Sequence, residues 1–436
     1  MCLHWASSVS AGEWSNFARC VGISAEDLDE SSESSPSLHS EAGQELRDCS
    51  VIIWDEVAQS SRLQLGLVDK LLRVLTGKLQ CTMGGKVVVF VGDFRQTTLV
   101  PPMFGGRSYI VENSVRRSPV WAHVKKYTLT ENMRAIHDTD EFRQWLLDVG
   151  NGMPVTLNTG VTVLSPSVAI APSMQVRDLE SLQRFVFGDY SDLSGKAILT
   201  LTNSTTTQVN NVCLVHLESE ERVYLADTSA LPNDPVGEGQ PYLAPPQELI
   251  NTLSHRSLPP HELRLRLGCR VMLLRNLGVK SGLCNGTMME VVQFYNNSIK
   301  VKILNGVRIR QVEYLFRVKL TAQHRYYPVN LQRYQFPIRL AFSMTINKSQ
   351  GQSFDRVGIY LDRDVFSHGQ LYVALSRAKR KIDLRLCIVK QPSMRRSSNA
   401  LSEVNVQNVV YYELLYDQQL IVRDVPNREV RPFQIL

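Results

Sequence analysis

Several patterns that would assign this chain to a specialised class are absent from its 436 residues. No run of eighteen apolar residues occurs, and the N-terminus lacks the basic-then-apolar pattern of a secretory signal, so we expect no membrane partner. The eight cysteines are scattered and form no C-x-x-C pair, which argues against a zinc ribbon or a disulfide framework. Such cysteines are typical of reduced intracellular thiols.

The composition is that of a globular protein with a sizeable core. Hydrophobic residues make up 43% and charged residues 21% of the chain, and its length predicts two to four domains. The net charge of +6 is compatible with a nucleic-acid partner but is weak evidence for one. The segment from Ser24 to Ser40 is rich in serine and acids, which predicts a mobile loop.

Two short apolar runs predict neighbouring buried strands of a parallel sheet. Val51–Trp54 leads into Asp55 and Glu56, and Lys86–Val91 leads into Gly92 and Asp93. Five apolar residues between the runs fall at helical spacing, which predicts a βαβ unit: Leu65, Val68, Leu71, Leu72 and Leu75. Ligands bind at the carboxyl ends of such strands, where an Asp-Glu pair can hold Mg²⁺ and orient a water. By itself the pair also fits a strand that ends in solvated acids.

The rest of the chain predicts a second α/β unit with a β-rich insertion. We expect a helix near Asp140–Val149 and a strand at Lys196–Thr202 followed by a polar helix. From about residue 225 short strands alternate with turns, and Asn305-Gly306 is a strong hairpin-turn signal. Around Phe336 the α/β pattern resumes, with a strand at Val357–Leu361 and a helix at Leu371–Ala378.

Three further polar strings can contact phosphates. Gly92–Gln96 follows the second strand, and a glutamine there can bond both a phosphate oxygen and a water, although the string also fits a plain turn. Phe342–Ser353 is rich in hydrogen-bond donors. On the helix that follows, Arg377 is a candidate arginine finger. A lone Arg134 could also reach a phosphate, but surface ion pairs are the commoner fate of such arginines.

Taken together, these strings resemble the Pif1-type DNA helicases of superfamily 1B, including those of eukaryotic genomes and Helitron transposons. The resemblance covers roughly residues 40–390. It rests on Val-Ile-Ile-Trp-Asp-Glu from Val51, Gly-Asp-Phe-Arg-Gln from Gly92, Leu-Thr-Glu-Asn-Met-Arg from Leu129, the string from Ala341 to Ser353, and Tyr-Val-Ala-Leu-Ser-Arg-Ala from Tyr372.

The resemblance implies two RecA-like parallel-sheet domains, the first incomplete, with an inserted SH3-like β-barrel. The implied limits are a partial first domain at 1–135, the second domain at 136–224 and 331–395, the barrel at 225–330 and a C-terminal tail at 396–436. The stretch Gln391–Asn399, which leads into this tail, looks loosely ordered.

The activity implied is ATP-driven 5′-to-3′ unwinding of duplex DNA with translocation on single-stranded DNA. Family members act in DNA repair, recombination or telomere maintenance. ATP is the substrate and Mg²⁺ the cofactor, and we expect a monomer in the nucleus, with the mitochondrion as the other possible location.

By position in the matching strings, Asp55 would hold Mg²⁺ and Glu56 would activate water. Gln96, Arg134 and Arg377 would contact the γ-phosphate. The residues implied to line the nucleotide cleft are Gly351 and Gln352, with Arg377 beside them. Those implied to lie near single-stranded DNA are Thr345, Asn347, Lys348 and Ser349.

The chain departs from the family at the phosphate-binding loop, G-x-x-x-x-G-K-[ST], which does not occur in the sequence. Gly84-Gly85-Lys86 lacks the upstream glycine and runs into a strand, and Gly195-Lys196 is followed by alanine. The family's next strand is expected to be missing or degraded near Met1–Ser10. We therefore expect an N-terminally truncated first domain with an unpaired sheet edge.

Without the loop, several charge-assisted hydrogen bonds of about 1.5–3 kcal/mol each are lost, so the chain should bind ATP poorly and unwind little. The alternative function is a catalytically impaired, transposon-derived remnant that only binds nucleic acid.

Overall fold

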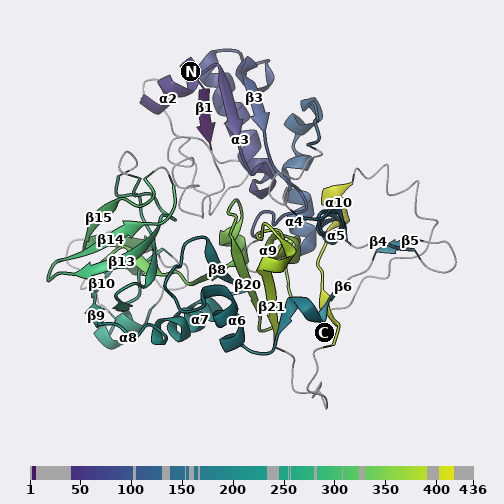
Figure 1. Ribbon diagram of the computed structural model, residues 1–436. Coiled ribbons are helices and arrows are strands. Elements are labelled where there is room, and N and C mark those ends of the chain that lie inside the picture. Colours follow the sequence, from purple (N-terminus) through teal and green to yellow (C-terminus); the bar gives the residue numbers. More distant parts are fainter. Residues whose placement is uncertain are drawn as a thin grey trace.

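A computed structural model shows two α/β lobes and a β-rich region (Figure 1). The structure describes residues 2–5, 41–101, 105–129, 138–152, 154–156, 162–164, 167–232, 245–253, 255, 257–278, 282–306, 308–323, 329–389 and 402–416. Three sequence predictions lie outside these residues: the loop at Ser24–Ser40, the position of Arg134, and the stretch around Gln391–Asn399. In the described part, no helix is long and apolar enough to cross a membrane.

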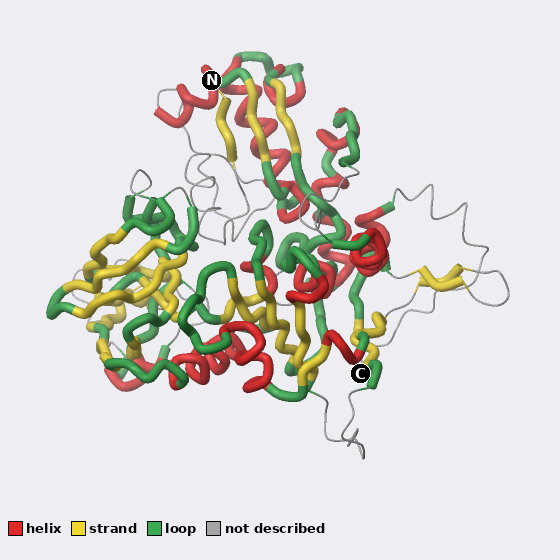
Figure 2. Tube along the Cα trace, viewed as in Figure 1, coloured by secondary structure: helices red, strands yellow, loops and turns green. Residues whose placement is uncertain are grey.

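The first lobe contains the predicted βαβ unit. Its parallel sheet has the order β1 (Cys2–Trp5), β2 (Val51–Trp54), β3 (Val87–Phe90), and Figure 2 shows these strands side by side. Helix α3 (Arg62–Thr76) connects β2 to β3, and all five leucine and valine positions predicted to face the core are buried on it. Of the expectation that the strand near the N-terminus is missing or degraded, the first alternative is wrong, because β1 pairs with β2 along its whole length. The second alternative stays a prediction.

Local signals explain where α3 begins and ends. The hydroxyl of Ser61 accepts a hydrogen bond from the Gln64 backbone while the Gln64 side chain accepts one from the Ser61 backbone, a reciprocal capping box. At the other end Gly77 takes the left-handed conformation, with φ 70°, that terminates helices. Helix α2 (Glu41–Asp48) precedes the unit.

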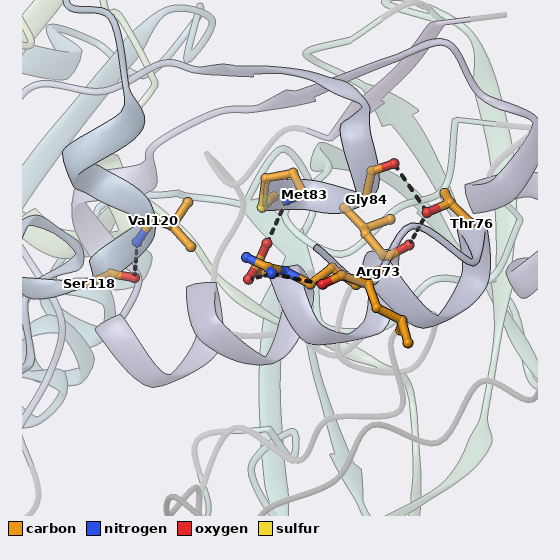
Figure 3. Close-up of polar contacts among 9 residues, drawn as sticks. Arg73, Thr76, Met83, Gly84, Ser118 and Val120 are labelled. Carbon is orange, nitrogen blue, oxygen red and sulfur yellow. Dashed lines mark hydrogen bonds and ion pairs between the residues drawn. The ribbon is translucent and has the colours of Figure 1, made fainter. Parts of the chain in front are cut away.

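The turn before β3 explains why Gly84-Gly85-Lys86 is not a phosphate loop. The turn is the 3₁₀ element η2 (Thr82–Gly85). The hydroxyl of Thr76, the last residue of α3, lies within hydrogen-bond distance of the carbonyl oxygens of Gly84 in η2 and Leu72 in α3 (Figure 3). A Cβ at Gly84 would lie 2.4 Å from a carbonyl oxygen of α3. Lys86 donates to the carbonyls of Arg47 and Cys49 at 2.8 and 2.7 Å, so this lysine secures α2.

Besides β1, strand β3 forms an edge of the sheet in the described part of the chain. It pairs with β2 on one side only, and Val87 and Val89 are 60% and 44% exposed. The prediction that this run is a buried strand is therefore wrong, and an exposed row of valines at a sheet edge favours association with another strand. Three short helical elements complete the lobe: α4 (Arg107–Asn113), η3 (Val115–Arg117) and η4 (Pro119–His123).

The second lobe is built on a five-stranded, fully parallel sheet. Its order is β19 (Ser343–Thr345), β8 (Lys196–Thr200), β20 (Arg356–Leu361), β21 (Leu384–Ile388), β7 (Gln175–Val176). The helices of the lobe are α5 (Asp140–Asn151), α6 (Leu179–Phe187), α7 (Asn203–Val215) and α9 (Gln370–Leu375). The strands predicted near 196 and 357 and the helix near 140 are confirmed, whereas α9 ends three residues before the predicted Ala378.

A β-rich region is inserted between α7 and β19. Its strands are β9 (Glu221–Leu225), β10 (Asp227–Pro232), β11 (Glu262–Arg266), β12 (Arg270–Leu273), β13 (Met288–Phe294), β14 (Ser298–Ile303), β15 (Val312–Phe316), β16 (Val318–Gln323), β17 (Val329–Gln335) and β18 (Ile338–Leu340), with α8 (Gln247–Thr252). The main sheet, β15-β14-β13-β12-β18, is antiparallel, and two smaller sheets, β10-β17-β16 and β11-β9, accompany it.

The insertion extends slightly beyond the predicted 225–330. Because β18 pairs with β12, the α/β pattern resumes at β19 and not around Phe336. Asn305-Gly306 does lie in the connection between the antiparallel strands β14 and β15, where Gly306 has φ 84°. The closure of these sheets as an SH3-like barrel stays a prediction.

Smaller elements accompany the two lobes. They are the hairpin β4 (Pro154–Thr156) and β5 (Thr162–Leu164), the antiparallel pair β6 (Ser167–Ile170) and β22 (Val404–Gln407), helix α10 (Tyr412–Leu415), and the 3₁₀ turns η1 (Val57–Gln59), η5 (Pro172–Met174), η6 (Ile346–Ser349) and η7 (Lys381–Asp383). Both β22 and α10 belong to the predicted C-terminal tail.

Candidate functional site

The carboxyl end of β2 carries the Asp-Glu pair. The Asp55 carboxylate accepts a hydrogen bond from the Glu56 backbone N–H at 2.9 Å. Glu56 itself has φ 51° and ψ 38°, a left-handed conformation that is unfavourable for a residue with a side chain. The backbone N–H of Val57 donates to the Val91 carbonyl at 2.9 Å and so holds this turn against the end of β3. Strain that is held in this way is characteristic of functional sites.

Gln350 connects the Glu56 side chain to the second lobe. Only 7% of Glu56 is exposed, and Gln350 Nε2 donates to its Oε2 at 2.9 Å. The amide oxygen of Gln350 accepts a hydrogen bond from the hydroxyl of Thr97. One buried glutamine of the second lobe therefore bonds to residues that follow both β2 and β3.

The surroundings of Glu56 favour proton uptake. Burial raises the pKa of the Glu56 carboxyl, and the negative charges of Asp55 and Asp93 raise it further. The hydrogen bond from Gln350 and the positive charge of Arg377 act in the opposite direction. A carboxylate with a raised pKa is a stronger base, as activation of a water molecule requires.

The Gly92–Gln96 loop is held by residues of both lobes. The Asp93 carboxylate accepts hydrogen bonds from Arg95 Nε at 2.8 Å and from the hydroxyl of Tyr372 on α9 at 3.1 Å. Burial raises the pKa of Tyr372 to about 12, so its hydroxyl stays a neutral donor. Among the described residues, Gln96 Oε1 is buried and has no hydrogen-bond partner. A buried amide oxygen without a partner is unfavourable, and a bound ligand or water can satisfy it.

Gly369, which precedes α9, brings the backbones of the two lobes into contact. Its φ is 69°, and an added Cβ would lie 2.3 Å from the carbonyl oxygen of Arg95. Only a glycine fits at this point, because both the left-handed conformation and the close approach exclude a side chain.

Arg377 is fully buried just beyond α9, and carbonyl and hydroxyl oxygens surround its guanidinium. Nε donates to Val373 O at 2.9 Å, Nη1 to Gln352 O at 3.0 Å and Nη2 to the hydroxyl of Ser376 at 2.8 Å. In this arrangement Arg377 fixes the loop after η6, and its charge acts on Glu56. Its role as an arginine finger stays a prediction, since a phosphate oxygen would have to replace one of these acceptors.

The four predicted DNA-contacting residues differ in their access to the surface. Asn347 is exposed and Lys348 is half-buried, and both lie on η6. Thr345 is buried at the end of β19, and Ser349 is fully buried with its hydroxyl donating to the Ile346 carbonyl at 2.7 Å. Direct contact with a nucleic acid in this conformation is therefore open to Asn347 and Lys348.

Gly351 and Gln352, the predicted cleft residues, lie beside Arg377. Gly351 is exposed with φ 75°, and Gln352 is half-buried and donates to the Lys348 carbonyl at 3.2 Å. The structure thus brings Glu56, the end of the Gly92–Gln96 loop and Arg377 close to the segment around Gln350. The roles of these residues toward a γ-phosphate or a water stay predictions. Arg134, the remaining predicted γ-phosphate contact, lies outside the described residues.

The sequence did not predict four residues whose side chains form hydrogen bonds at this site: Thr97, Gln350, His368 and Tyr372. Gln350 and Tyr372 stand inside strings that the resemblance had singled out, and proximity to the selected residues was the available signal. His368 gave no signal, since a lone histidine next to a glycine predicts nothing in particular.

These features place the chain among proteins with two RecA-like α/β lobes. The parallel sheets of the two lobes carry polar loops that face each other. The family model described as PIF1-like helicase matches residues 18–160, and the one described as DNA helicase Pif1, 2B domain, matches residues 248–294. In these two segments the chain is similar to Pif1-like helicases.

Two curated relatives show how the similarity is distributed. The ATP-dependent DNA helicase PIF1 of Rattus norvegicus is 40% identical over 157 residues, which are 35% of this chain and 24% of that protein. The ATP-dependent DNA helicase PIF7 of Trypanosoma brucei brucei is 24% identical over 413 residues, 85% of this chain and 38% of that protein. The chain therefore spans about a quarter of the length of the mammalian relative and well under half of the trypanosome one.

Solved structures show the same fold. A structure of two coordinating Pif1 helicases at forked DNA has a TM-score of 0.61 at 21% identity, covering 90% of this chain and 84% of that one. Pif1 helicase from Bacteroides in complex with ADP-AlF3 and single-stranded DNA also has a TM-score of 0.61, at 19% identity, covering 90% and 85%.

Proposed function

We propose that this protein is an ATP-dependent DNA helicase of the Pif1 type, which couples ATP hydrolysis to 5′-to-3′ translocation on single-stranded DNA and to duplex unwinding. The observation that carries the proposal is the position of Glu56. This acid is buried in a strained left-handed turn at a strand end, and a glutamine of the opposite lobe holds it near a buried arginine. The PIF1-like helicase family model matches residues 18–160, which include Glu56.

In this proposal each residue has a separate task. Asp55 is the ligand for Mg²⁺, which neutralises phosphate charge when bound. A single carboxylate suits this ion, because Mg²⁺ keeps several waters and takes its other ligands from phosphates. Among the described residues, no group of three or more His, Cys, Asp and Glu side chains forms a self-sufficient metal site. Glu56 accepts a proton from the attacking water, and the unpartnered Gln96 oxygen orients that water.

Asn347 and Lys348 are proposed to contact the phosphates of single-stranded DNA. They lie on η6 directly after β19, and Thr345 at the end of β19 pairs with Thr200 at the end of β8, two residues before Thr202. The N-terminus of α7, capped by Thr202, is therefore near the same sheet end, and its backbone N–H groups favour anions.

The experiment is measurement of phosphate release from the 436-residue chain with and without single-stranded DNA. DNA-stimulated release that is lost in Glu56→Gln supports hydrolysis at this site, because glutamine keeps the shape and cannot take the proton. Release that Glu56→Gln leaves intact would show that another site is responsible.

The alternative function is that of a catalytically impaired remnant that only binds nucleic acid. One observation favours it: the sequence contains no phosphate-binding loop. In that case the chain binds single-stranded DNA in a salt-dependent manner and releases no phosphate. Nuclear residence, a monomeric state and a role in DNA repair, recombination or telomere maintenance belong to the proposal as well. Imaging of the tagged protein and light scattering test the first two.

A further inference from the structure

The C-terminal segment 402–416, here called the strap, begins on the second lobe. Its strand β22 pairs antiparallel with β6 from Val404 to Gln407. The Gln175 side chain donates from Nε2 both to Ile170 O of β6 and to Ser402 O of the strap, at 2.7 and 3.0 Å. The ladder and this shared amide attach the start of the strap to the parallel sheet.

The middle of the strap runs along helices α5 and α9. The buried Asn408 side chain donates to the carbonyl of Val149 near the end of α5 at 2.8 Å. The backbone N–H of Gly369 donates to Val409 O at 3.0 Å. The strap thus passes directly behind the glycine that touches the Gly92–Gln96 loop.

The end of the strap is bound to the first lobe. Glu413 receives hydrogen bonds from Arg107 on both carboxylate oxygens at 2.8 Å, and the same guanidinium lies 5.3 Å from the centre of the Tyr411 ring. Arg116 donates to the carbonyl of Leu414, whose side chain is buried. In Figure 1, α10 accordingly lies next to α4, although β22 belongs to the second lobe.

His368 joins the strap to the loop. This fully buried imidazole accepts the Tyr411 backbone N–H at Nδ1 at 2.9 Å, and its Nε2 lies 2.7 Å from the carbonyl oxygen of Phe94. Because the first bond needs an acceptor and the second a donor, the ring is neutral with its proton on Nε2. It also stacks on Tyr411, with ring centres 5.2 Å apart.

Several charged groups surround the imidazole. Burial lowers the pKa of His368, and the nearby Arg107 lowers it further, while Asp93, Glu413 and the bond to the Phe94 carbonyl act in the opposite direction. The neutral form that the two hydrogen bonds require is therefore favoured.

We propose that the strap clamps the two lobes together and acts through His368 to hold the Gly92–Gln96 loop, which makes His368 a positioning residue for Gln96. Phe94, which the imidazole holds, is two residues from Gln96, and Gly369 contacts the backbone between them. The role of Gln96 in orienting a water rests on the proposed helicase activity, whereas the clamp between the lobes does not.

The first test is amide hydrogen exchange on the 436-residue chain without nucleotide or DNA, so that the result is independent of hydrolysis. Glu413→Gln weakens the bond to Arg107 and should speed exchange about two- to fivefold in both segments 409–416 and 94–98, as loss of a partly exposed ion pair predicts. The matched control is Glu180→Gln, which removes the same charge from the exposed Arg184 pair on α6 and should leave both segments unchanged. Faster exchange in the strap alone, or in neither segment, would overturn the clamp.

The second test separates the two hydrogen bonds of His368. In His368→Asn the side-chain oxygen can replace Nδ1 as acceptor for Tyr411, whereas in His368→Gln the longer amide can replace Nε2 as donor to Phe94. Asparagine should release segment 94–98 more than the strap, and glutamine the strap more than the loop. Equal acceleration of both segments in both variants would indicate general loss of packing and contradict a positioning role.

Discussion

Replacing Gly369 by alanine should separate the two lobes without unfolding either of them. The added Cβ would lie 2.3 Å from Arg95 O and 2.6 Å from the carbonyl carbon of Gln96, and both are backbone atoms that cannot rotate away. The clash can be relieved by moving the first lobe from α9, because the contact is between lobes and not within one.

The size of the effect follows from a comparison with Gly268. That residue has φ 80° and nothing within 4 Å of an added Cβ, so Gly268→Ala carries only the left-handed penalty of about 1–2 kcal/mol. Gly369→Ala carries the same penalty plus overpacking of about 1–3 kcal/mol. The overpacking contribution lowers the population of molecules whose lobes are in contact at this position by a factor of about 5 to 150.

Small-angle scattering and thermal denaturation of both variants check the reasoning. We expect a larger radius of gyration for Gly369→Ala than for Gly268→Ala, while the far-ultraviolet dichroism of both stays that of the unmodified chain. If the two variants have the same radius and the same melting temperature, the contact across the lobes does not hold the arrangement, and the reasoning fails.

Four further outcomes follow from individual contacts. Ser61→Ala removes the capping box of α3 and should cost about 1 kcal/mol in urea denaturation of the first lobe. Gln350→Leu leaves the buried Glu56 carboxylate without its partner and should lower stability by about 1–3 kcal/mol, seen as a lower melting temperature. The pKa of His368 is lower in the folded chain than the ordinary 6.5. The neutral imidazole therefore contributes fully to stability above pH 6.5, and this contribution is lost as the pH falls below 6.5, because the unfolded chain then binds the proton. Urea titrations at several pH values should show this decrease in stability, and His368→Asn should lack the decrease. Lys348→Ala should reduce the salt dependence of single-stranded DNA binding by about one unit of log–log slope, and an unchanged slope would exclude a phosphate contact.

Local patterns predicted the βαβ unit well. The spacing from Leu65 to Leu75 specifies which residues of α3 are buried without reference to the rest of the chain. The prediction that the second apolar run is a buried strand is wrong, because Val87 and Val89 are exposed at the edge of the sheet. The same reasoning misplaced the return of the α/β pattern, because the partner of β18 is β12, over sixty residues earlier, and periodicity carries no information on pairing. It also extended α9 to Ala378, whereas the helix ends at Leu375 and Arg377 turns inward to bond the carbonyl of Gln352.

The sequence by itself determined which chemical groups stand at the strand ends, because Asp55, Glu56 and Gln96 follow apolar runs that predict strands, and it determined the resemblance that those strings carry. Only the tertiary structure decided how these groups are held. Gln350 reaches Glu56 from 294 positions along the chain, and His368 meets Phe94 from 274 positions away. Contacts between residues so distant in sequence depend on how the lobes pack against each other, and no local propensity or spacing encodes that packing.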